Sequence, residues 1–95
     1  MRISEYERQV IVESVINTDP EARIWLFGSR TDDKKRGGDI DIGVLSSKLG
    51  VMEEIEIKQK IYDKIGEQKI DLFVSKDGLE AFFKFAVSKG IILHG

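Results

Sequence analysis

Three aspartates interrupt segments that otherwise have the apolar pattern of β-strands. In segment 39–45, apolar residues alternate with polar or small ones, which is the two-residue period of a strand with one buried face. Segment 70–74 has the same pattern. Because aspartate is depleted in strands, three aspartates are unexpected there: Asp39, Asp41 and Asp71. Their presence suggests a functional role for these carboxylates.

The alternation places the three carboxylates opposite the apolar residues of their strands. Residues two apart on a strand are separated by about 6.5–7 Å and paired strands by about 4.8 Å, so pairing of the two segments would bring the carboxylates together. Carboxylates that close repel one another and raise each other's pKa unless a cation intervenes. Mg²⁺ takes such oxygen ligands and keeps positions for substrate phosphates. Carboxylates that bridge two ions roughly 3.5–4 Å apart form the geometry of two-metal displacement at phosphorus.

A second candidate element is the pair Gly28 and Ser29, directly after the apolar segment 23–27. Glycine lets the backbone turn sharply and lets a phosphate approach closely. Ser29 adds a hydroxyl and a free N–H, and a helical turn beginning there would direct further N–H groups at an anion. The segment 30–38 separates this pair from the first aspartate.

Each of these features also has a simpler interpretation. The aspartates would also fit the solvated face of an antiparallel sheet, and for Asp71 alone that interpretation is favoured. The Gly-Ser pair, taken by itself, is better explained as a plain turn at the end of a strand. An Asp-x-Asp pair also binds the metal-diphosphate of sugar-nucleotide glycosyltransferases, but those domains need a far larger fold than 95 residues supply. An EF-hand is excluded because its ligands at further spacings are missing.

The rest of the sequence predicts helices around these strands. Ser4 and Glu7 have the spacing of a capping box, which opens a helix that ends near Asn17. Asp77 and Glu80 have the same spacing and are expected to begin the last helix. We therefore expect helices at 4–17, 52–65 and 77–90, and strands at 23–27, 39–45, 70–74 and, at an edge, 91–93. Side chains expected in the core include Tyr6, Trp25, Leu79, Phe82 and Phe83. This order predicts an α+β fold with a mixed, mainly antiparallel sheet flanked by helices.

Composition limits the class of protein. The 95 residues suffice for one domain, 1–95, and the 15 basic and 17 acidic residues give a net charge of −2, without the basic excess of a DNA-coating protein. The chain has no cysteine, which excludes disulfides and thiolate metal sites. The longest apolar run is four residues, against about 20 for a membrane span. With no signal peptide visible, we expect a soluble cytoplasmic domain.

The combination of a Gly-Ser turn, a spacer, an Asp-Ile-Asp-Ile strand and a further strand aspartate resembles the nucleotidyltransferase superfamily typified by DNA polymerase β. The stretches 28–30 and 38–44 are most similar to its minimal nucleotidyltransferase branch, whose small single domains often act as antitoxins beside a helical HEPN partner. The resemblance implies that Asp39, Asp41 and Asp71 hold two Mg²⁺ ions, with Mn²⁺ as an alternative. It also implies that Asp71 helps to deprotonate the acceptor hydroxyl.

The same resemblance assigns Gly28 and Ser29 to the triphosphate of an NTP, expected to be ATP. Arg30 would contact these phosphates or the leaving pyrophosphate, although a surface salt bridge fits it equally well. The implied reaction moves AMP to a hydroxyl, expected to be a tyrosine of the HEPN partner, so that the protein acts as an antitoxin. The alternative is a non-catalytic antitoxin that neutralises its partner by forming a complex with it.

A third option is a free-standing enzyme acting on a small molecule. Relatives of that kind add a second domain for the acceptor, and 95 residues leave none to build one. The acceptor site would then come from another molecule or from a second copy of the chain in a homo-oligomer. Two other features have open roles. Lys34, Lys35 and Arg36 would meet nucleotide phosphate or an acidic partner, or simply form a solvated loop. An exposed Phe85 would suit a partner-binding patch, and partial burial of this side chain is the alternative.

Overall fold

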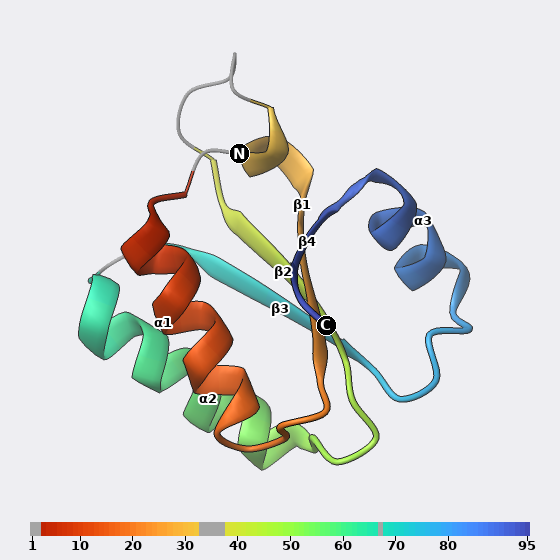
Figure 1. Ribbon diagram of the computed structural model, residues 1–95, viewed down its shortest axis with the longest axis horizontal. Coiled ribbons are helices and arrows are strands. Elements are labelled where there is room, and N and C mark those ends of the chain that lie inside the picture. Colours follow the sequence, from red (N-terminus) through yellow and green to blue (C-terminus); the bar gives the residue numbers. More distant parts are fainter. Residues whose placement is uncertain (1–2, 33–37, 67) are drawn as a thin grey trace.

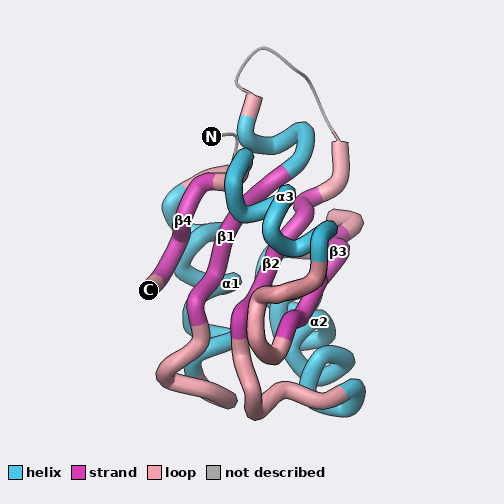
Figure 2. The backbone as a smooth tube through the Cα atoms, turned by 90° about the vertical axis from the view of Figure 1, so that its right-hand side faces the viewer, coloured by secondary structure: helices cyan, strands magenta, loops and turns pink. Residues whose placement is uncertain are grey.

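A four-stranded sheet with helices on both faces is the centre of the fold. The structure, a computed structural model, describes residues 3–32, 38–66 and 68–95. Figures 1 and 2 show α1 and α2 on one face of the sheet and α3 on the other. In chain order the elements are α1 (Glu5–Ile16), β1 (Arg23–Phe27), the 3-10 turn η1 (Gly28–Thr31), β2 (Ile40–Leu45), α2 (Val51–Ile65), β3 (Ile70–Ser75), α3 (Ala81–Lys89) and β4 (Ile91–His94).

The strand order is β3-β2-β1-β4. β1 runs antiparallel to both β2 and β4, whereas β2 and β3 are parallel because the helix α2 connects them. The predicted α+β class with a mixed, mainly antiparallel sheet is therefore confirmed, and so is the short last strand at an edge. The parallel pair means that β2 and β3 begin at the same end of the sheet, which is also the end where β1 finishes.

The main core lies between the sheet and the helices α1 and α2. The alternate residues Ile40, Ile42 and Val44 of β2 are fully buried there, as the two-residue period predicts. From α2 the residues Ile57 and Ile61, one helical turn apart, are buried against them. This apolar layer fixes the register of β2, so the residues between the isoleucines must face α3.

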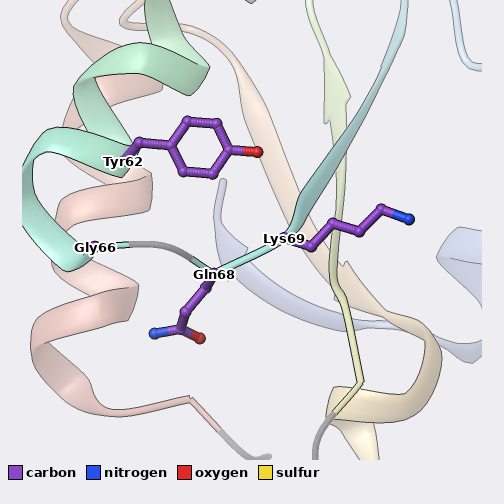
Figure 3. A pocket seen from close by; sticks show the side chains of 4 residues that line it. All are labelled: Tyr62, Gly66, Gln68 and Lys69. Carbon is purple, nitrogen blue, oxygen red and sulfur yellow. The ribbon is translucent and has the colours of Figure 1, made fainter.

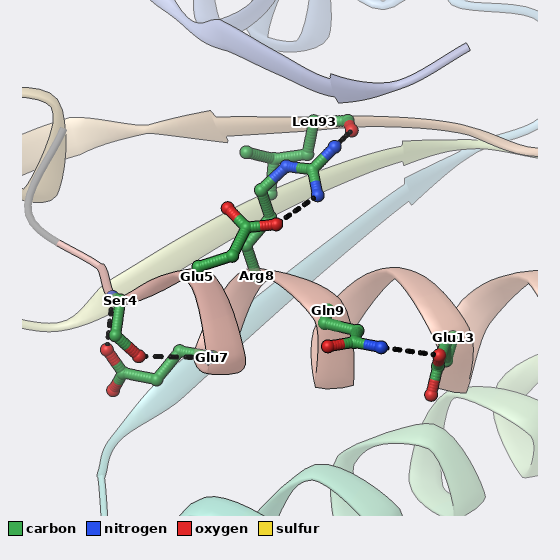
Figure 4. A network of polar contacts seen from close by, with 7 residues as sticks. All are labelled: Ser4, Glu5, Glu7, Arg8, Gln9, Glu13 and Leu93. Atoms are coloured by element: carbon green, nitrogen blue, oxygen red, sulfur yellow. Dashed lines mark hydrogen bonds and ion pairs between the residues drawn. The ribbon is translucent and has the colours of Figure 1, made fainter.

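Polar contacts hold α1 at its start and along its length. The capping box is present: the Glu7 backbone N–H donates to Ser4 Oγ (3.0 Å), and the Ser4 N–H donates to Glu7 Oε1 (2.7 Å). Arg8 donates to the Leu93 carbonyl of β4 (3.1 Å), which ties the helix to the edge of the sheet (Figure 4). The expectation that Tyr6 belongs to the core is wrong, since its side chain is 56% exposed.

The segment before α3 differs from the sequence expectation. Asp77 does not cap the helix; its carboxylate accepts from the Leu79 N–H (3.0 Å) in a turn, and α3 starts at Ala81 with Glu80 as the N-cap residue. Leu79 is outside the helix and exposed, and Phe82 is 54% exposed, so neither belongs to the core as expected. Phe83 is buried as predicted. This nine-residue helix buries only Phe83 and Ala86, which leaves Phe82 partly in solvent.

A buried carboxylate joins the turn after α1 to the loop after β2. Ser46 Oγ donates to Asp19 Oδ2 (2.5 Å), the Glu21 N–H donates to Asp19 Oδ1 (3.0 Å), and Lys48 Nζ lies 3.8 Å from that oxygen. The Ser46 hydrogen bond is the main reason that the pKa of Asp19 is lowered, against the opposing effect of burial. Because the lowered pKa favours the folded state only while the group is ionised, this stabilisation is lost as the pH falls through the folded-state pKa.

Replacing Asp19 with alanine is expected to lower the free energy of unfolding by about 1–3 kcal/mol at neutral pH, because the buried Ser46 hydroxyl loses the acceptor for its own hydrogen bond. Chemical denaturation of the wild type and the variant measures this. Asp77→Ala is the control, since Asp77 is exposed, and its effect should stay within about 0.5 kcal/mol. Equal stabilities for Asp19→Ala and Asp77→Ala would contradict the assignment.

Candidate active site

One row of side chains crosses the sheet on the face that α3 partly covers. The antiparallel register pairs Phe27 of β1 with Asp41 of β2, and the parallel register pairs Asp41 with Asp71 of β3. The expected pairing of the two aspartate-bearing strands is thus confirmed. Asp41 and Asp71 are therefore neighbours across the parallel strand pair.

The electrostatic environment of Asp41 is unfavourable for its charge. Burial is the largest cause that raises the pKa of this carboxyl above its ordinary value of 3.8, followed by the charges of Asp71 and Asp39 and by the hydrogen bond with Asp71. The Lys69 charge acts in the opposite direction but does not outweigh them. The negative charges of Asp39 and Asp71 therefore both act on Asp41, and a divalent cation bound among the three carboxylates would reduce their repulsion.

Asp39 lies directly before β2 and is partly exposed. Its Oδ2 is 3.4 Å from Lys69 Nζ. Sequence analysis missed Lys69, although its position two residues before Asp71 places it on the same strand face as that carboxylate. Lys69 also borders a hollow of about 470 Å³ next to Tyr62 and Gln68, with its amine directed away from the tyrosine ring (Figure 3).

Gly28 brings the end of β1 against the carboxylate of Asp41. Its φ is +76°, which favours glycine, and a β-carbon at this position would overlap Asp41 Oδ2. The turn η1 that begins there is closed by Thr31, whose Oγ1 donates to the Gly28 carbonyl (2.7 Å). Ser29 follows in the same turn, and Gly28 itself stands directly beside Asp41.

Arg30 connects this turn to neighbouring segments. Its Nε donates to the Gly38 carbonyl (3.2 Å), immediately before Asp39, and its Nη2 donates to Gln68 Oε1 (3.2 Å). Gln68 in turn donates to Glu7 Oε2 (2.6 Å). Burial acts to raise the pKa of Glu7, but hydrogen bonds with Ser4 and Gln68 and the charge of Arg30 lower it. The guanidinium therefore holds η1, the start of β2 and α1 together.

The basic residues Lys34, Lys35 and Arg36 lie outside the described residues. The exposure expected as one option for Phe85 is observed, at 64%. Trp25 is buried as predicted, on the face that carries α3, where its ring meets Phe83 edge-on at 5.7 Å.

The donor chemistry of this site fits a hard divalent cation. Carboxylate oxygens from Asp39, Asp41 and Asp71 are the ligands that Mg²⁺ prefers. Burial and, after it, the charges of Asp71 and Asp39 raise the pKa of Asp41, and a cation would offset the repulsion between these charges. In the conformation described, Asp39 pairs with Lys69. No group of three or more Asp, Glu or His side chains in residues 3–32, 38–66 and 68–95 is already gathered around one point.

Without metal, the charge of Asp41 is expected to destabilise the fold. A carboxyl with a raised folded-state pKa makes the folded state bind more protons than the unfolded state, so its contribution to stability falls as the pH rises through that pKa. In EDTA at pH 7.5, Asp41→Asn should therefore melt at a higher temperature than the wild type, and the difference should shrink as the pH falls toward 4. Thermal unfolding at several pH values measures it. A difference independent of pH would contradict an origin in the charge of Asp41.

Comparison with known proteins places the chain in a family. A family model described as "Polymerase beta, Nucleotidyltransferase" matches residues 9–95. The chain belongs to this family of nucleotidyltransferases, and the resemblance drawn from the Gly-Ser turn and the aspartates is confirmed at that level.

A solved structure has the same fold. A chain in the crystal structure of a mutant of the toxin–antitoxin MntA–HpeT superposes with a TM-score of 0.73 and 24% sequence identity, over 93% of this chain and 72% of that chain. A search of curated proteins gave no match. Within the described part of the chain, none of the helices combines the length and apolar character needed to cross a membrane.

Proposed function

We propose that this protein is a metal-dependent nucleotidyltransferase that moves AMP from ATP to a hydroxyl group of a partner protein. The observation that carries the proposal is the packing of Gly28 against Asp41, with Asp71 in register on the next strand. A turn that admits no β-carbon, directly beside paired carboxylates, suits a site that binds phosphates and cations together.

In this proposal Asp39, Asp41 and Asp71 hold two Mg²⁺ ions, for which Mn²⁺ would substitute. The ions would neutralise phosphate charge and polarise the α-phosphate. Metal binding would require Lys69 to leave Asp39, because that ion pair and a metal would compete for the same carboxylate. The exposure of the Lys69 side chain, at 71%, leaves it free to move into solvent.

The backbone of Gly28 and Ser29 would hold the triphosphate. The acceptor oxygen attacks the α-phosphorus, its proton passes to Asp71, and the bond between the α-phosphorus and the α–β bridging oxygen breaks as pyrophosphate leaves. Catalysis is then mainly positioning and charge neutralisation. We assign Arg30 to positioning, since its hydrogen bonds to Gly38 and Gln68 fix the approach to Asp39.

The acceptor is proposed to be a tyrosine hydroxyl of a HEPN-type toxin, which makes this protein an antitoxin. The similarity to a chain of the toxin–antitoxin MntA–HpeT supports a toxin as the partner. The carboxylates lie at an end of the sheet with Asp39 partly exposed, so a partner could present its hydroxyl there.

Incubation with α-phosphate-labelled ATP, Mg²⁺ and the candidate toxin tests the proposal. Label should pass to the toxin with the wild type and fall to background with Asp39→Asn. Undiminished transfer by Asp39→Asn would discard the site, whereas a stable complex without any transfer by the wild type would favour the non-catalytic antitoxin.

A further inference from the structure

A second hollow lies beside the Gly28 turn, on the side of α3. It has a volume of about 350 Å³. Its walls are Phe27, Gly28 and Thr31 from β1 and η1, and Phe82, Phe85 and Lys89 from α3. The fold therefore leaves a space between the turn and the helix, and Gly28 belongs both to this space and to the carboxylate site.

The walls of this hollow are unusually aromatic for a surface. Phe82 is 54% exposed and Phe85 is 64% exposed, in a helix that buries only Phe83 and Ala86. The Phe82 ring already packs against two other rings: its centroid is 6.1 Å from that of Phe27 and 5.2 Å from that of Phe73. Phe85 has no ring partner among the described aromatic pairs, so one of its faces is available to a ligand.

We propose that this hollow binds the nucleoside of the NTP, with the base stacked against Phe85. The inference rests on the proposed function, because it requires the triphosphate to lie on the backbone of Gly28 and Ser29. A nucleotide held there has its flat, aromatic part within reach of the space that Gly28 also borders. The volume is within the range of small-ligand pockets, which are mostly apolar with few polar groups.

The chemistry of the walls favours a base over a side chain of the partner protein. Stacking on an aromatic side chain tolerates any base, since every base has a π-face. Lys89, which also lines the hollow, adds a cation that suits a ligand carrying phosphates. The Thr31 hydroxyl already donates to the Gly28 carbonyl, and so it is not a donor for the ligand.

Competition binding of Mg·ATP and of Mg·tripolyphosphate to the 95-residue chain tests this inference. Phe85→Ala should weaken ATP binding about 5- to 100-fold, the range expected from the loss of one stacking contact. Its affinity for tripolyphosphate should stay within twofold. Phe85→Trp should restore ATP binding, and Leu79→Ala, which removes another exposed apolar side chain outside the hollow, should change neither ligand.

The outcomes separate this inference from the proposed function. If the wild type binds neither ligand, the phosphate site itself fails. If both ligands bind but Phe85→Ala weakens neither, the phosphate site stands and the nucleoside site is overturned. If Phe85→Ala instead weakens only the complex with the toxin, the aromatic surface docks the partner, and the nucleoside site is again overturned.

Discussion

Replacing Asp41 with asparagine is expected to reduce nucleotidyl transfer at least about 10³-fold while the protein stays folded. Asp41 is central in the carboxylate row, in register with Asp71 and two residues from Asp39. Asparagine keeps the size of the side chain but removes the charge that a divalent ion requires. Removing a single electrostatic contact to the transition state costs about 10²–10³ in rate, and here the proposed cation site would be weakened as well. The measurement is the initial rate of label transfer at saturating Mg²⁺.

Asp63→Asn is the matched control for this prediction. Asp63 lies on α2, across the sheet from the carboxylate row, and accepts a hydrogen bond from Gln59 (2.9 Å). The same chemical change there should alter the rate less than twofold. Comparable losses from both variants would mean that the effect of Asp41→Asn is not local to the site.

Substituting Gly28 with alanine is expected to remove at least about 99% of the transfer activity, a 10²-fold loss of the kind caused by small displacements of catalytic groups. The added methyl group overlaps the Asp41 carboxylate, so this carboxylate must leave its present position. The positive φ of Gly28 adds about 1–2 kcal/mol of backbone strain. Both activity and the free energy of unfolding should be measured on the same preparation.

Gly66→Ala is the control that separates the effect of backbone strain from the effect of moving the Asp41 carboxylate. Gly66 also has a positive φ, +83°, but apart from its chain neighbours and its own helix backbone, no described residue has an atom within 4 Å of the added methyl group. The two variants should therefore lose similar stability, while only Gly28→Ala loses activity. If Gly66→Ala is equally inactive, loss of stability rather than movement of Asp41 explains the result.

Most of the fold could be predicted because its strands alternate so regularly. Only one register buries Ile40, Ile42 and Val44 against α2, and that register sets Asp41 on the opposite face. The start of α1 was equally predictable, because both capping hydrogen bonds involve residues three apart.

The start of α3 was predicted at Asp77, whereas Glu80 is the N-cap residue in the structure. Asp77 has the spacing of an N-cap, but its carboxylate bonds the Leu79 N–H inside a turn. Ser75 then accepts from the Gly78 N–H (2.7 Å) and donates to Glu80 (2.7 Å), which delays the helix to Ala81. Local spacing cannot decide between a cap and a turn when both satisfy the same backbone groups.

Within the site, the sequence indicated the carboxylates but not their neighbours. The ion pair of Asp39 with Lys69 and the contacts of Arg30 with Gly38 and Gln68 join residues far apart along the chain or across a turn. They depend on where β3 begins beside β2, which no local pattern specifies. The exposure of Phe82 was likewise unpredictable, because a short helix can bury only part of its apolar surface.

The most direct test of the account uses ATP labelled with one isotope at the α-phosphate and another at the γ-phosphate, with Mg²⁺ and the toxin partner. Transfer of a nucleoside monophosphate predicts that the toxin acquires only the α label, while the γ label leaves as pyrophosphate in equal amount. Acquisition of the γ label, or release of inorganic phosphate in place of pyrophosphate, would contradict the chemistry assigned to Asp39, Asp41 and Asp71.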